Sequence, residues 1–348
     1  MKRYFGSLTL TAAAFLFIVF AGCQESPLDA SLDAQTDYEA YLQLIAADSS
    51  LASFEPNYNE DGAMEFLGKV NTPIFPFRVG HHVKLVNRVL TTETINDTTF
   101  GTLTSTFEGT LIIAASFTAE SDKPDTLIRK PFTSVVTRKI IFARIARTNR
   151  PLLNWKIAAI SLPEGGTLTD NIQITKLTLT YEDGEQVVIT SPNDYFLVRH
   201  HLDIRGHGGD HGGQGGNDGG KPGNGGDGHI GAGLRFRLGF MFGMPQVNPG
   251  EEVKLTLEVT SAYADSDFVT LTYNGRHGGT DRSKKKFNLI SSQQSGNVYL
   301  KVYEQTYVTN NHPGFFHAVI NVMPSQAVLD DASSVEAKMW GVPYEVHR

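Results

Sequence analysis

The chain is nearly devoid of cysteine: its 348 residues include one, Cys23. No disulfide can therefore form within the chain, and no cluster of thiolates can hold zinc. Stability has to come from hydrophobic packing, which a 40% hydrophobic composition can supply over this length. The length itself leaves room for about two domains.

Positive charge is also in short supply. The chain has 30 Lys and Arg against 37 Asp and Glu, a net charge of −7. Binding to nucleic acid needs a clustered positive surface that neutralises phosphates, so we expect no nucleic-acid partner. We interpret the one basic cluster as a solvated hairpin tip that protects a sheet edge, with an anionic glycan or lipid phosphate as the alternative. Its members are Arg276, His277, Arg282, Lys284, Lys285 and Lys286.

Motifs of common catalytic sites are missing too. The sequence has no G-x-S-x-G, no H-E-x-x-H, and no S-x-x-K with its partner motifs. Carboxylates are plentiful, but one sequence does not show which of them converge, so a glycosidase with two carboxylates stays open. We predict a non-catalytic protein and keep, as an alternative, an enzyme that uses a pocket in the first domain.

The longest apolar run lies near the N-terminus. Lys2 and Arg3 precede the apolar stretch Leu8–Phe20, and Cys23 follows it closely. A basic start followed by a short apolar segment is typical of an export signal. The apolar core is shorter than the roughly 20 residues that a membrane-spanning helix needs. The sequence therefore predicts a signal peptide over residues 1–22.

The residues Ala21-Gly22-Cys23 resemble the lipobox of bacterial lipoproteins, although Phe20 stands where leucine is usual. The resemblance implies cleavage before Cys23 and acylation of this cysteine with chains such as palmitate, which would anchor the protein to a membrane. In enteric-type bacteria, a residue other than aspartate after the lipidated cysteine is associated with the outer membrane, and Gln24 follows here. We therefore expect an exported protein anchored in the cell envelope at the outer membrane, with a protein or glycan as its ligand.

The first folded segment is expected to begin with a helix. Residues 23–35 are polar and without periodicity, which predicts a tether. Thr36 and Glu39 then have the spacing of a capping box. The apolar residues that follow at helical spacing are Tyr38, Tyr41, Leu42 and Ile45. Together these features predict a helix over about 36–48.

Long strands are predicted next, and with the helix they form an α+β domain over 36–165. Their predicted ranges are Val83–Thr94, Gly101–Ala115, Thr133–Arg147 and Leu153–Leu162, with a turn at Asn96-Asp97. A helix followed by antiparallel strands that carry Arg138, Phe142, Arg144 and Trp155 resembles the cone-shaped fold of the nuclear-transport-factor-like superfamily over 36–163. The resemblance implies a curved sheet around a pocket, which some members use for catalysis and others only for binding.

The pattern after residue 165 is purely β. Asp183-Gly184 predicts a two-residue type I′ hairpin. Val253, Leu255, Leu257 and Val259 alternate with polar residues, as in a strand with one buried face. Further strands are expected at Phe268–Tyr273, Lys286–Ile290, Asn297–Tyr303 and Phe315–Met323. This rhythm resembles an immunoglobulin-like sandwich, so we predict a mainly β protein with a small α+β part and a β-sandwich domain over 166–348.

A glycine-rich segment, residues 205–233, interrupts this second domain and holds 15 of the 34 glycines. With almost no apolar side chain it is expected to be a flexible insert. Histidines and aspartates in and beside it suit Zn²⁺, Ni²⁺ or Cu²⁺. The candidate ligands are His200, His201, His207, Asp210, His211, Asp227 and His229. A metal-binding lipoprotein and a solvated linker are both consistent with this composition.

Two smaller groups also invite a functional interpretation. His81 and His82 precede a predicted strand, but neighbouring strand residues point to opposite faces and do not easily share one ion. We interpret this pair as ordinary surface and core. Tyr299, Tyr303 and Tyr307 could form a ligand platform, although their alternation favours simple packing.

Overall fold

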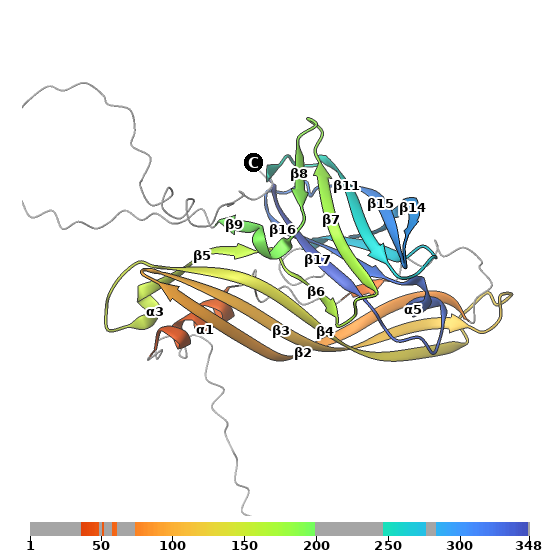
Figure 1. The fold of residues 1–348 in the computed structure, drawn as a ribbon, viewed down its shortest axis with the longest axis horizontal. Coiled ribbons are helices and arrows are strands. Elements are labelled where there is room, and N and C mark those ends of the chain that lie inside the picture. The colour runs from red at the N-terminus through yellow and green to blue at the C-terminus, as the bar shows by residue number, and fades with distance from the viewer. Residues whose placement is uncertain are drawn as a thin grey trace, which may run out of the picture.

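The computed structural model describes residues 36–48, 51, 58–60, 74–198, 246–275 and 283–346. These residues form a mainly β protein with antiparallel sheets and a few short helices (Figure 1). The predicted fold class is therefore confirmed. One sheet has 12 strands and the other has five. Within the described ranges, no helix combines the length and apolarity needed to cross a bilayer.

Helix α1 (Asp37–Ala47) confirms the predicted helix and its cap. The Thr36 hydroxyl accepts a hydrogen bond from the Glu39 amide at 3.2 Å, and the Glu39 carboxylate accepts one from the Thr36 amide at 3.0 Å. Each bond satisfies a backbone donor that a helix start leaves without an intrahelical partner. Tyr41 and Ile45 are buried on the inner side of this helix, whereas Tyr38 remains largely exposed.

Three long strands follow: β2 (Phe75–Ile95), β3 (Thr98–Ser116) and β4 (Thr126–Arg144). The turn at Asn96-Asp97 is confirmed, and Asn96 adopts a left-handed φ of 56°, which asparagine tolerates better than most residues. Strand β2 begins well before the predicted Val83, although it contains Pro76. The pairing register shifts between Pro76 and Arg78, and such a bulge can accommodate a residue without an amide hydrogen.

After β4 the chain turns back through the short helix α3 (Pro151–Asn154). It then runs antiparallel beside β4 as strand β5 (Trp155–Ser161). The predicted strand from Leu153 is therefore two residues too long at its start. Pro151 suits the first turn of a helix. Asn154 holds the loop before it by accepting from the Thr148 amide at 2.7 Å and donating to the Thr148 carbonyl at 3.0 Å.

Strand β6 (Glu164–Thr167) joins the two halves of the 12-stranded sheet. It pairs with β4 on one side and with β17 (Lys338–Val346) on the other. A Cβ atom on Gly165 would overlap the Val135 carbonyl, and one on Gly166 would overlap the Ala337 carbonyl. Only glycines let both neighbouring backbones come this close. The sheet thus runs straight through the position expected to separate two domains.

The five-stranded sheet has the order β14-β15-β11-β7-β8. Its strands are β7 (Ile172–Thr180), β8 (Gln186–Ile189), β11 (Glu252–Ser261), β14 (Asn288–Ser295) and β15 (Val298–Val308). The alternation predicted for β11 is confirmed, because Val253, Leu255, Leu257 and Val259 are all at most 1% exposed.

The hairpin between β7 and β8 differs from the predicted type I′ turn. Gly184 has a φ of +86°, but Asp183 keeps a negative φ, whereas type I′ needs positive values at both central residues. The Gly184 amide donates to the Tyr181 carbonyl, and the Tyr181 amide donates to the Glu185 carbonyl. This pattern is a three-residue loop that ends in a glycine bulge, which also reverses the chain between neighbouring strands.

Strands β12 (Phe268–Gly275), β16 (Gly314–Met323) and β17 form the middle layer of the molecule. Figure 1 shows β7, β11 and β15 on one side of β17 and the long strands β2–β4 on the other. Ile320 of β16 packs into the core shared with the five-stranded sheet, while its neighbour Val319 packs against β2–β4. Burial on both faces explains why residues 318–323 are almost uninterruptedly apolar.

Six short elements complete the described fold. They are β1 (Tyr58–Glu60), η3 (Pro192–Asp194), β9 (Phe196–Val198), β10 (Gln246–Val247), β13 (Ser283–Lys286) and α5 (Ser325–Leu329). Strand β13 extends the edge of the middle layer beside β12, and α5 contacts β2.

Candidate functional site

The concave face of β2–β4 is the first place to look for a site, because a curved sheet can enclose a ligand. Helix α1 covers one end of it: the Tyr41 ring stacks on Phe142 with centroids 4.5 Å apart and meets Trp155 edge-on at 5.1 Å. The Arg144 guanidinium lies 4.6 Å from the centre of the Trp155 ring and pairs with Asp37 at 3.0 Å. Aromatic packing and one cation therefore fill this end.

The middle of the concave face is covered by the C-terminal part of the chain. Val319 of β16 and Met339 of β17 pack in one cluster with Val83, Phe107 and Val136 of the long strands. All five side chains are at least 90% buried. The residues that would line an open pocket in the first half of the chain therefore form a core with its second half.

The far end is covered by α5 and the segment that follows it. Val328 packs against Leu111 and Ile113. The Lys130 ammonium is buried there and donates to the carbonyls of Ala327, at 2.9 Å, and of Asp330. These carbonyls lie at the end of α5, where a lysine is a favourable cap. Burial lowers the pKa of Lys130.

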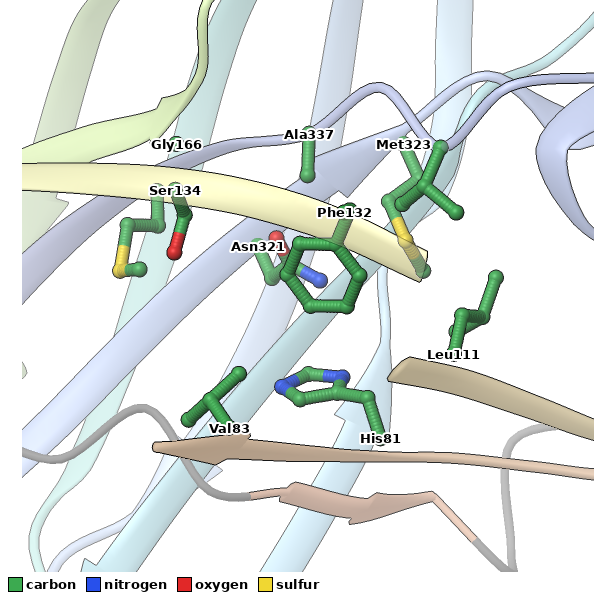
Figure 2. Close-up of a pocket in the computed structure, with 11 residues that line it drawn as sticks. His81, Val83, Leu111, Phe132, Ser134, Gly166, Asn321, Met323 and Ala337 are labelled. Atoms are coloured by element: carbon green, nitrogen blue, oxygen red, sulfur yellow. The ribbon is translucent and has the colours of Figure 1, made fainter. Parts of the chain in front are cut away.

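A cavity of about 30 Å³ lies between β2–β4 and the middle layer. Figure 2 shows His81 reaching from β2 toward Phe132, with Ser134 and Asn321 also at the cavity. The lining residues are His81, Val83, Leu111, Phe132, Ser134, Gly166, Asn321, Met323, Val335, Ala337 and Met339. Three of them have polar side chains, and none carries a carboxylate.

The cavity is the right size for about two water molecules and too small for an organic substrate. The Ser134 hydroxyl oxygen is buried and has no hydrogen-bond partner among the described residues, and water can satisfy such a group. His81 contacts the Phe132 ring edge-on at 5.9 Å. Its neighbour His82 is exposed, so the two histidines diverge as expected and do not form a joint metal site.

A second polar cluster lies where β5, β6 and η3 meet. Burial raises the pKa of Glu164, which accepts a hydrogen bond from the Asn193 amide at 2.5 Å. Lys139 pairs with Asp194 at 2.5 Å and lowers the pKa of that carboxyl. Opposite shifts in neighbouring carboxyls are typical of acid–base pairs. Here, however, the hydrogen bonds hold η3 against the sheet, and the cavity described above does not reach them.

A buried ion pair lies in the core between the two sheets. The Lys301 ammonium of β15 is 3.0 Å from the Asp267 carboxylate, and both side chains are fully buried. The same carboxylate accepts from the hydroxyls of Ser261, at 3.0 Å, and Tyr303, at 3.1 Å. Lys301 also donates to the Asp265 carbonyl. With every charge paired, this network fixes the β11–β12 connection and offers no open coordination position.

The residues that the sequence singled out most strongly lie outside the described ranges. Cys23 is among them, and so are all seven candidate metal ligands: His200, His201, His207, Asp210, His211, Asp227 and His229. Within the ranges that are described, no three His, Cys, Asp or Glu side chains are grouped so that they could hold a metal ion.

The tyrosines and part of the basic cluster do lie within the described fold. Tyr303 and Tyr307 are buried in the core between the sheets, which agrees with the packing interpretation. Lys284, Lys285 and Lys286 lie on β13, at the edge of a sheet. That position fits the protection of a sheet edge, but these side chains are half-buried rather than solvated: Lys285 donates to the Thr306 carbonyl at 2.8 Å, and burial lowers the pKa of Lys286.

Sequence reasoning missed the buried polar residues, although one of them left a signal. Lys301 lies two residues from both Tyr299 and Tyr303, so alternation places it on the same strand face as those tyrosines. Predicting burial of the tyrosines therefore implied a buried lysine that needs an anion. Nothing comparable in the local sequence marks Ser134 or Asn321.

Comparison with known protein families, with curated proteins and with solved structures finds no match for this chain. The likeness of its leader to a lipobox, and of its two halves to nuclear-transport-factor-like and immunoglobulin-like folds, therefore stays a hypothesis. Function has to be argued from the geometry.

Proposed function

We propose that the protein is a lipid-anchored module of the cell envelope that acts by binding or by structural support, without catalysis. The observation that supports this best is the filled concave face of β2–β4. The cavity between the described residues of this face and the middle layer has a volume of about 30 Å³, and no carboxylate lines it. Substrate pockets are typically at least ten times larger.

The sequence of the N-terminal segment supports the anchor. Cys23 directly follows an export-type leader, and the described fold starts at Thr36. The segment between them can span up to about 45 Å when extended, so the folded part can stand clear of lipid headgroups. An acidic chain held in this position fits a protein or glycan ligand better than a nucleic acid.

The anchor is tested by replacing the cysteine. Cys23→Ser should abolish labelling with radioactive or clickable palmitate and leave an unprocessed precursor, whereas the unaltered chain should be labelled and fractionate with the outer membrane. Adding Ser26→Cys to the Cys23→Ser variant is the matched control. It restores a thiol three residues away, outside the lipobox pattern, and should not restore the label. Normal processing of Cys23→Ser would contradict the proposal.

The binding role needs its own experiment, because a lipid anchor is compatible with many functions. A glycan ligand predicts that the purified chain sediments with isolated cell-wall polysaccharide. A protein ligand predicts cross-linking to a defined neighbour in intact cells. Release of soluble sugar or peptide fragments during either incubation would contradict a non-catalytic role and would favour the enzyme alternative.

A further inference from the structure

Strand β14 is an unusually open edge of the five-stranded sheet. It pairs with β15 on one side, and the sheet ends there. All eight residues of β14 are exposed, and its sequence, Asn-Leu-Ile-Ser-Ser-Gln-Gln-Ser, contains neither charge nor proline. Such an edge presents unpaired backbone donors and acceptors to any other strand that approaches.

The other edge strands in the described part of the protein are protected. Strand β8 has four residues, and the four residues of β13 include three lysines. Strands β1, β9 and β10 have three residues or fewer. Strand β2 is long, but its charged residues and two register shifts disfavour pairing with another chain. Of these edges, β14 alone is both long and neutral.

Exposed apolar side chains lie along the same hairpin, two at the end of β14 that is far from the turn and two on β15 toward the turn. Leu289 and Ile290 on β14 are 39% and 56% exposed, and Val298 and Leu300 on the adjoining β15 are 38% and 44% exposed. A bulge between Leu289 and Ser291 interrupts the pairing at one end of β14. The stretch from Ser291 to Ser295 is regular and can accept another strand.

We propose that β14 pairs with β14 of a second copy of this chain, antiparallel and across a two-fold axis. In this pairing each β14 faces an identical β14. Because the strand carries no charged residue, no like charges face each other, whereas two copies of β13 would bring lysines opposite lysines. A two-fold contact uses the same surface on both partners and is closed, so association stops at a dimer. The opposite edge, β8, is too short to carry the sheet further.

The test uses two differently tagged copies of the full chain, expressed together and purified in detergent through one tag. Unaltered copies should co-purify. Ser291→Lys combined with Gln293→Lys sets like charges opposite each other for any two-fold axis centred on residue 291, 292 or 293. When both copies carry these two lysines, the amount of co-purified partner should fall at least tenfold. The same fall is expected when both copies carry Ser291→Glu combined with Gln293→Glu.

Mixing the two variants is the decisive arm. A lysine copy and a glutamate copy should co-purify as well as the unaltered pair, because opposite charges then face each other. Gln186→Lys combined with Val188→Lys, at exposed positions of β8 in the same sheet, is the matched control and should behave like the unaltered chain. Circular dichroism checks that every variant is folded. The proposal is overturned if unaltered copies fail to co-purify, if the lysine copies still do, or if the mixed pair does not.

Discussion

Replacing Lys301 by methionine should destabilise the protein severely. Methionine keeps much of the length and packing of the lysine but removes its charge, so the fully buried Asp267 carboxylate loses the ammonium group that pairs with it. The Ser261 and Tyr303 hydroxyls still donate to it, but they carry no compensating charge. Breaking a buried ion pair in this way costs about 3–5 kcal/mol, a large share of a total stability of roughly 5–15 kcal/mol.

Urea unfolding followed by circular dichroism measures this loss, and a melting temperature lowered by roughly 6–20 °C should accompany it. The matched control is Lys176→Met. Lys176 pairs with Glu258 at 2.8 Å in the same sheet, but the two side chains are 39% and 43% exposed. Because exposed pairs contribute at most about 1 kcal/mol, this variant should stay within that margin of the unaltered protein.

The pH dependence gives an independent check on the cause. Burial raises the pKa of Asp267 even beside Lys301, whose charge lowers it, so removing the lysine raises this pKa further. The folded carboxyl then keeps its proton at pH values where the unfolded one has lost it, and stability falls as pH rises through that range. Lys301→Met should therefore lose more stability at pH 8 than at pH 5. A loss below about 1 kcal/mol, or one that grows toward acid pH, would refute the reasoning.

Two further predictions concern the sheet junction and the glycine-rich insert. Gly165→Ala should cost about 3 kcal/mol or more in urea unfolding, because its Cβ would overlap the backbone of β4. Gly184→Ala, whose Cβ would meet nothing within 4 Å, should cost about 1–2 kcal/mol for its left-handed φ alone. The metal alternative predicts micromolar binding of Zn²⁺, Ni²⁺ or Cu²⁺ in calorimetric titration, lost when His207, His211 and His229 are changed to alanine. Binding that survives these changes would exclude them as ligands.

Features set by neighbouring residues were predictable from the sequence. The capping box of Thr36 and Glu39 predicted where α1 begins, because both hydrogen bonds close within one turn. The alternation from Val253 to Val259 predicted the buried face of β11, because side chains of a strand alternate between its two faces. Neither inference required knowledge of what covers the buried face.

Features that depend on distant residues were not predictable in this way. The sequence predicted a strand that begins at Val83, but pairing with β3 carries β2 back to Phe75. The turn after β7 contains the predicted Asp-Gly pair, yet pairing of Tyr181 with Glu185 lengthens the loop by one residue. In both places the hydrogen bonds of the finished sheet decide the local conformation.

The filling of the concave face of β2–β4 also depends on distant residues, and it bears most directly on where a ligand could bind. Val83, Phe107 and Val136 are an apolar strand face that, judged from 36–165 alone, could line a pocket for a ligand. They are covered by Val319 and Met339, which lie more than 180 residues further along the chain, and a single sequence contains no signal that pairs such distant positions. A segment ending at residue 165 would leave this face exposed to water. The two halves therefore share a core across the concave face of β2–β4, and the binding role that we propose directs the search for a ligand to the outer surfaces and edges of the sheets.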